Sequence, residues 1–218
     1  MLAAPQELKP VVIVVPRNAA KVFRGRVSGA TYAVVDTEFF ISQINTIVQL
    51  ANLRVEALPI LVTRNVLLAP EADVKRCCVL GFHTAFEGGV SEGRQFVQTM
   101  VWSSWLDSGF LSPGIADVTP MSHEISEWMN DPFGTNIVPA WQYPTASLGC
   151  QNNLETGDPV ANLPNAGFPV LMDGATYHPQ NQVMLAWFTR QPSDAVDHAY
   201  SFPDQSLVTS PSQACPAK

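Results

Sequence analysis

The 218-residue sequence predicts a single α+β domain, with a twisted mixed β-sheet packed on two helices and followed by a loop-rich lobe. Short β-rich runs fill much of the first half of the chain, and two stretches have apolar residues at helical spacing. From residue 133 to 178 the chain is rich in Pro, Gly and Asn and shows little periodicity. We therefore expect an N-terminal sheet and helix lobe over about 1–131 and a loop-rich C-terminal lobe over about 132–218.

The charge and composition of the chain disfavour some classes of binding partner. The chain has 19 acidic and 12 basic residues, a formal charge of −7, and no run of Lys or Arg. Nucleic acid and anionic membrane are therefore poor partners. No apolar run is long enough to span a bilayer, and Met1–Pro5 shows neither the basic nor the apolar region of a signal peptide. We expect a mature secreted or periplasmic domain whose leader has been removed.

The four cysteines are Cys77, Cys78, Cys150 and Cys215. They lack the C-x-x-C spacing of a thiolate zinc site, so two disulfides are the better interpretation. Neighbouring residues of a strand point to opposite sides, so we expect the first two cysteines to pair one each with the last two. Such pairing requires an oxidising compartment. A cytosolic protein with four free thiols is the alternative.

Val11–Val15 is a continuous apolar run and is predicted to form a central strand buried on both faces. Val22–Val27 is expected to pair with it. From Asp36 to Ala51 apolar residues recur at spacings of three and four, which predicts an amphipathic helix with Asp36 or Thr37 as its N-cap.

Further strands are predicted at Ala57–Thr63, Asn65–Leu68, Cys77–Ala85 and Gln95–Trp105. Pro59 is typical of a strand start or a sheet edge. Gly88-Gly89 predicts a turn. A helix is the alternative for the last of these strands.

A second helix is predicted over Ile115–Asn130, and it ends at Asp131-Pro132 because the residue before proline resists the helical conformation. Its apolar residues are expected to face inward; these are Ile115, Val118, Ile125 and Met129. Asp131 is interpreted as a helix-end residue that makes local hydrogen bonds. Gln180–Arg190 is predicted to be a short helix or strand, followed by a loop-like tail that is tied down through Cys215.

The second helix carries the main chemical motif. His123 and Glu127 stand four residues apart, so their side chains share one helix face and can bind one cation. The pattern is the H-E-x-x-H of zinc peptidases with the second histidine replaced by glutamate, and in that motif the intervening residue, here Glu124, is the general base.

A catalytic zinc takes three protein ligands, so a third must come from elsewhere in the chain. Glu155 is the first choice, and Asp158 is either the alternative ligand or a residue that holds a ligand in place. An ordinary turn explains the same two residues, because Gly157 and Asp158-Pro159 have turn chemistry. His178 is a further candidate, as a ligand or as a donor to a developing oxyanion. His83 is interpreted as a residue of the substrate cleft or of the packing.

The segments Ser122-His-Glu-Ile-Ser-Glu-Trp-Met-Asn-Asp-Pro132 and Gly149-Cys-Gln-Asn-Asn-Leu-Glu-Thr-Gly-Asp158 resemble the H-E-x-x-E-x-x-x-D-P and E-x-G-D elements of secreted bacterial zinc metallopeptidases of zincin-like type. These in turn resemble the phosphate-induced, EXORDIUM-like proteins. The resemblance covers roughly Cys77–Trp187 and rests on those two motifs. It implies a zincin-like α+β fold with a backing helix and an active-site helix.

By the same resemblance, His123 and Glu127 are metal ligands, Glu124 is the base, and Glu155 with Asp158 forms a distal acidic pair. Zn²⁺ is the expected cofactor, and Mn²⁺ or Ca²⁺ are alternatives because carboxylate oxygens suit harder cations.

The sequence thus predicts a secreted metal-dependent peptidase that acts on a peptide or protein, which could pair with the strand of Gly81–Ala85 if that strand lies at the sheet edge. A non-catalytic extracellular binding or signalling protein with a structural metal site is the alternative. The presence of Glu124 favours the enzyme, because structural metal binding does not require it. Serine hydrolase and nucleotide-dependent functions have no motif in this sequence.

Overall fold

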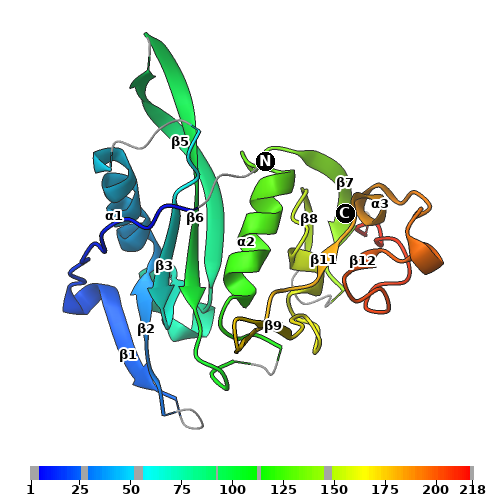
Figure 1. The fold of residues 1–218 in the computed structure, drawn as a ribbon, viewed down its shortest axis with the longest axis horizontal. Helices are drawn as coiled ribbons and strands as arrows, with labels where there is room; N and C mark the ends of the chain where they lie inside the picture. Colours follow the sequence, from blue (N-terminus) through cyan, green and yellow to red (C-terminus); the bar gives the residue numbers. More distant parts are fainter. Residues whose placement is uncertain are drawn as a thin grey trace.

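A computed structural model of the chain describes residues 5–25, 29–51, 56–91, 93–111, 114–144 and 149–216. The fold is α+β, as the sequence predicted, with several small sheets and with the helices α1 (Thr37–Leu50), α2 (Thr119–Asn130) and α3 (Leu185–Thr189) in the described ranges (Figure 1). None of the helices in these ranges has both the length and the apolar character needed to cross a membrane.

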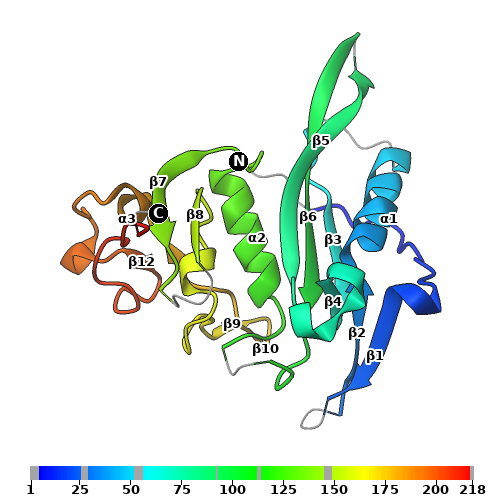
Figure 2. The ribbon, with the colours of Figure 1, turned by 180° about the vertical axis from the view of Figure 1, so that it is seen from behind.

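The first half of the chain forms two three-stranded sheets with the orders β1-β2-β4 and β3-β6-β5 (Figure 2). Their strands are β1 (Ala20–Arg24), β2 (Thr31–Asp36), β3 (Ile60–Arg64), β4 (Val66–Ala69), β5 (Gly81–Ser91) and β6 (Arg94–Trp105). Asn65 alone separates β3 from β4 and joins the two sheets: its N–H donates to Trp105 O, and its carbonyl accepts from Ala33 N–H. The parallel pairs are β2 with β4 and β3 with β6, and the others are antiparallel, so the predicted mixed pairing is confirmed.

The hairpin β5–β6 is the longest pairing and projects beyond the rest of the sheet (Figure 1). The strand predicted over Gln95–Trp105 is confirmed by β6. The turn predicted at Gly88-Gly89 is wrong, because β5 continues to Ser91 with a register shift between Glu87 and Val90. The two glycines lie at this register shift. Glycine is common at such strand irregularities as well as in turns.

The amphipathic helix predicted over Asp36–Ala51 is confirmed by α1. Asp36 is the N-cap and accepts a hydrogen bond of 2.8 Å from Phe39 N–H. Phe40, Ile44 and Val48 are buried, and they pack on a sheet face that includes Trp102 of β6. Helix α2 lies on the opposite side of the strands, so the sheet is covered on both faces (Figures 1 and 2).

The predicted central strand at Val11–Val15 is wrong. This segment has no strand pairing, and Val12 and Val14 are 85% and 83% exposed. Ile13 and Val15 pack against the core beneath α1, so alternate residues of the segment cover that core. An apolar run alone does not distinguish a strand buried on both faces from a covering segment of this kind.

Helix α2 begins at Thr119, four residues later than predicted, after Asp117 adopts a positive φ of 34°. The expected apolar inner face is also wrong for Met129, which is 65% exposed, whereas Glu124 and Glu127 are buried. This helix directs acidic residues inward because its inner face meets polar partners, described below. At its end, Asp131 accepts hydrogen bonds of 2.9 Å from Thr135 N–H and Asn136 N–H, so its predicted local role is confirmed.

The C-terminal lobe follows α2 and lies on the side of that helix away from the sheet (Figure 1). Its short strands are β7 (Ile137–Gln142), β8 (Cys150–Asn153), β9 (Val170–Met172), β10 (Ala175–Tyr177), β11 (Gln182–Val183) and β12 (Ser201–Phe202). Trp141 of β7 packs edge-on against Trp187 and Phe188 of α3 and anchors the core of this lobe. The segment predicted as helix or strand at Gln180–Arg190 contains both β11 and α3.

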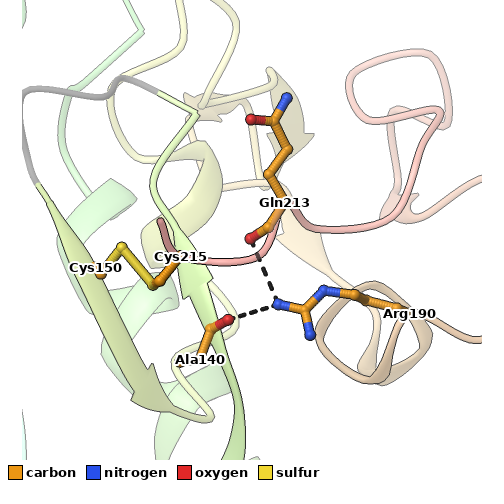
Figure 3. The surroundings of a disulfide bond; sticks show 5 residues. All are labelled: Ala140, Cys150, Arg190, Gln213 and Cys215. Atoms are coloured by element: carbon orange, nitrogen blue, oxygen red, sulfur yellow. Dashed lines mark hydrogen bonds between the residues drawn. A yellow bond between two sulfur atoms is a disulfide. The ribbon is translucent and has the colours of Figure 1, made fainter. Parts of the chain in front are cut away.

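Two disulfides are present, but not with the expected partners: Cys77 pairs with Cys78, and Cys150 pairs with Cys215. The prediction assumed a strand at the adjacent cysteines, and neither residue lies in one. The second disulfide ties the tail to β8, as expected for Cys215. Arg190 strengthens this attachment by donating to the carbonyls of Ala140 in β7 and Gln213 in the tail (Figure 3).

Candidate metal centre

Helix α2 lies between the strand β5 and the C-terminal lobe (Figures 1 and 2). Six titratable side chains meet around this helix. They are His83 from β5, His123, Glu124 and Glu127 from α2, and Glu155 and Asp158 from the segment after β8. The helix supplies three of them because Glu127 follows His123 by four residues and Glu124 by three, so its side chain neighbours both on the helix surface.

In its neutral form, His123 presents a lone pair to the centre of this cluster. Its Nε2 lies 3.1 Å from Glu127 Oε2 and 3.5 Å from Asp158 Oδ1. Its Nδ1 lies 3.1 Å from Gln180 Oε1, and Gln180 is oriented by a hydrogen bond of 2.7 Å from its Nε2 to Gly157 O. Since the amide oxygen can only accept, Nδ1 carries the hydrogen of the neutral ring. Nε2 then has a lone pair that can bind a cation.

The two carboxylates beside His123 are held in the same manner. Glu127 Oε1 accepts from Gly157 N–H at 3.0 Å and from Asp158 N–H at 3.2 Å, which leaves Oε2 facing the cluster. Asp158 Oδ2 accepts from Tyr143 OH at 2.5 Å and from Gln151 Nε2 at 2.8 Å, which leaves Oδ1 facing His123. Each candidate ligand thus has one polar atom held by a hydrogen bond on the outer side of the cluster and a second polar atom directed into the cluster.

His83 follows the same pattern from the opposite side. Its Nε2 lies 3.1 Å from Asp131 O, and a carbonyl oxygen can only accept, so Nε2 carries the hydrogen of the neutral ring. Its Nδ1 lies 3.3 Å from Glu124 Oε2 and 3.8 Å from Glu127 Oε2. The side chain is only 5% exposed. The sequence placed this histidine in the cleft or the packing and gave no signal that it would meet the acidic residues of α2, 41 positions away.

Two glycines permit the close approach of backbone to these side chains. A Cβ at Gly157 would lie 2.5 Å from His123 Nδ1, and a Cβ at Gly81 would lie 2.6 Å from Glu124 Cγ. Both distances are shorter than any ordinary carbon contact, so larger residues at either position would displace the side chains of the cluster. The conformation of Gly157 itself is ordinary, with φ −85° and ψ −31°.

The electrostatics of the cluster favour a positive charge inside it. Burial alone would lower the pKa of His123, but the Glu127 carboxylate, with Glu124 and Asp158, raises it well above the usual value. Burial alone would also lower the pKa of His83, but the neighbouring carboxylates raise it above its usual value. Burial, with the Glu127 charge, raises the pKa of Glu155 to about 7. Among the described residues, no Lys or Arg forms an ion pair with these carboxylates.

The other predicted site residues lie as follows. Glu155 Oε2 lies 3.9 Å from His83 Nε2 and is buried without a hydrogen-bond partner. His178 is paired with Asp117, whose Oδ2 lies 2.6 Å from His178 Nδ1. Sequence reasoning did not find Tyr143, Gln151 and Gln180, because nothing in their local pattern connects them to the helix.

Two groups in the described part of the chain have ligand atoms that all lie within 4.8 Å of one another. The first contains His123, Glu127 and Asp158, and the second contains His83, Glu124 and Glu127. Both groups share Glu127, and Glu155 belongs to neither. The first group has the one imidazole and two carboxylates that a divalent cation accepts as ligands.

Comparison with protein-family models, with curated proteins and with solved structures gives no match to this chain.

Proposed function

We propose that the protein is a secreted metal-dependent peptidase with a zincin-like fold, in which His123, Glu127 and Asp158 hold a divalent cation and Glu124 is the general base. One observation carries this proposal: each of the three ligands is fixed by a hydrogen bond at one polar atom and directs the other inward. Outer hydrogen bonds of this kind orient metal ligands and fix the tautomer of ligating histidines.

Asp158 is preferred to Glu155 as the third ligand. Its Oδ1 lies 3.5 Å from His123 Nε2, and its other oxygen is held by Tyr143 and Gln151. Burial and the Asp158 charge raise the pKa of Tyr143 above its usual value, so the phenol keeps its hydrogen and donates it to the carboxylate. Glu155 lies on the His83 side of the cluster and adds negative charge to it.

The three ligand side chains fit Zn²⁺, and their two carboxylates also leave Mn²⁺ and Ca²⁺ as alternatives. When bound, such a cation supplies a Lewis acid for the scissile carbonyl and acidifies a water molecule.

Glu124 is placed to move a proton. Its carboxylate is buried, with Oε1 3.9 Å from His123 Nε2 and Oε2 3.3 Å from His83 Nδ1. Unlike Glu127, it accepts no hydrogen bond from the backbone of the described residues, so both oxygens are available inside the cluster. Glu124 takes a proton from the attacking water and then gives it to the leaving amine, which are the two tasks of a general base and acid in peptide hydrolysis.

An extended peptide is the substrate that suits the surrounding fold. In the described ranges β5 pairs with β6 only, so one of its edges has no strand partner. The backbone of β5 next to His83 offers hydrogen bonds to a peptide in strand conformation, beside the cluster on α2. The order of strands, α1, strands, α2 and an irregular lobe is the order that zincin-like peptidases use. The disulfides support an oxidising, extracellular or periplasmic location.

The test is cleavage of an unstructured peptide library by the purified protein, with and without a zinc chelator. Glu124→Gln keeps the shape of the side chain and removes the base, so the cleavage rate falls by about 100-fold or more. Glu38→Gln, an exposed glutamate of α1, is the matched control and cleaves like wild type. Cleavage that survives chelation, or that Glu124→Gln retains in full, contradicts the proposal. Zinc binding without any cleavage identifies a non-catalytic binding protein instead.

A further inference from the structure

We propose a second cation position in the same cluster, formed by His83 Nδ1, Glu124 Oε2 and Glu127 Oε2, and adjacent to the first through the shared Glu127 oxygen. This inference rests on the metal centre of the proposed function and adds a second ion to it.

His83 is oriented to bind a cation through Nδ1. Its Nε2–H is used by the Asp131 carbonyl, so in the neutral ring Nδ1 has a lone pair and no hydrogen. This lone pair faces the oxygens of Glu124 and Glu127, which also carry lone pairs. Three electron donors that face one another in a buried space require a positive species between them. The donation of Nε2–H to a backbone carbonyl is also the arrangement that ligating histidines have.

A proton on Nδ1 is the competing species, and it satisfies the geometry less well. It would hydrogen-bond to Glu124 Oε2 at 3.3 Å, while Glu127 Oε2 at 3.8 Å is beyond hydrogen-bonding distance. A cation has no such directional limit and draws both oxygens and the ring nitrogen toward itself.

The cluster also has an excess of acidic side chains. Four carboxylates meet in the cluster, those of Glu124, Glu127, Glu155 and Asp158, and among the described residues no Lys or Arg is paired with them. With both imidazoles neutral and Glu124, Glu127 and Asp158 ionised, one divalent cation leaves one negative charge uncompensated, and Glu155 adds to it when ionised. A second cation compensates this charge. Glu155 adds to the negative charge around His83, since its Oε2 lies 3.9 Å from His83 Nε2 and is buried with no hydrogen-bond partner.

The second position has a consequence for the proposed reaction. A cation there takes Glu124 Oε2 as a ligand, and a carboxylate that binds a cation is no longer free to accept a proton from water. The first cation therefore supports cleavage, and the second suppresses it at higher metal concentration.

The experiment measures the number of zinc ions per chain by equilibrium dialysis of metal-stripped protein against increasing Zn²⁺. Wild type is expected to bind two, and His83→Gln and His123→Gln one each. His198→Gln, a histidine on the exposed tail, is the matched control and binds two. Thermal melting of each variant establishes that it is folded, and the wild-type stoichiometry does not depend on any variant.

The outcomes separate this inference from the proposed function. If wild type binds one ion and His83→Gln keeps it, the second position is refuted and the first stands. If wild type binds one ion, His83→Gln binds none and His123→Gln binds one, the single ion lies at the His83 position. There is then no second ion, and the ligand set of the proposed function is wrong as well. If wild type binds none, both are wrong.

Discussion

Replacing Gly157 by alanine tests whether the backbone around His123 sets the geometry of the metal centre. The added Cβ would lie 2.5 Å from His123 Nδ1, and an ordinary contact begins near 3.4 Å, so the ring must move by about 0.9 Å. The hydrogen bond from Nδ1 to Gln180 Oε1 is 3.1 Å long, and a shift of this size away from Gln180 stretches it to about 4 Å, beyond hydrogen-bonding range.

The expected loss follows from these two effects. Loss of the outer hydrogen bond of a metal-ligating histidine lowers metal affinity by roughly 10- to 100-fold, and crowding in a packed site costs about 1–3 kcal/mol of stability. The backbone of Gly157 has helical φ and ψ, so alanine adds no conformational strain there and the effect reports the contact alone.

The assay is zinc affinity by competition with a chromophoric chelator, together with thermal unfolding of the metal-free protein. Gly174→Ala is the control: Gly174 has φ +79° and no atom near its missing Cβ, so the variant loses about 1 kcal/mol of stability and no zinc affinity. Gly157→Ala that binds zinc as tightly as wild type would refute the role assigned to this close contact.

Three further results are expected. Tyr143→Phe removes the hydroxyl that binds Asp158 Oδ2, so zinc affinity falls by roughly 10-fold, measured by the same competition assay; an unchanged affinity would exclude Asp158 as a supported ligand. Asp117→Asn lowers the Tm at pH 7. Burial alone would raise the pKa of Asp117, but hydrogen bonds from His178 hold it below its usual value, so the ionised carboxylate stabilises the fold above its unfolded-state pKa, and this contribution is lost as pH falls through the folded-state value. The gap from wild type, about 1–3 kcal/mol at neutral pH, must therefore narrow in acid, and a gap that widens contradicts the assignment. Cys215→Ser opens a disulfide that spans 65 positions and destabilises the chain by about 2–5 kcal/mol in denaturant unfolding, whereas no change would show that the tail is held without it.

The sequence alone determined those features that depend on neighbouring residues. The spacing of apolar residues and the capping Asp36 predicted α1, because a helix satisfies its hydrogen bonds locally. The spacing of His123 and Glu127 put both on one face of α2, and Asp131-Pro132 set the end of that helix. The acidic pair after β8 was predicted from its residue types and from the family resemblance, with an ordinary turn as the alternative, and the structure brings both residues to the cluster on α2.

The tertiary structure decided what fills the space around those residues. His83 comes from a strand 41 positions before Glu124, and Gln180 lies 57 positions after His123, so no local pattern connects them to α2. The same holds for the pairing of Cys150 with Cys215 and for the covering role of Val11–Val15. Local periodicity reports which residues are apolar and how they repeat, whereas the second histidine, the outer hydrogen bonds and the inward-facing carboxylates depend on which distant segments the folded chain brings together.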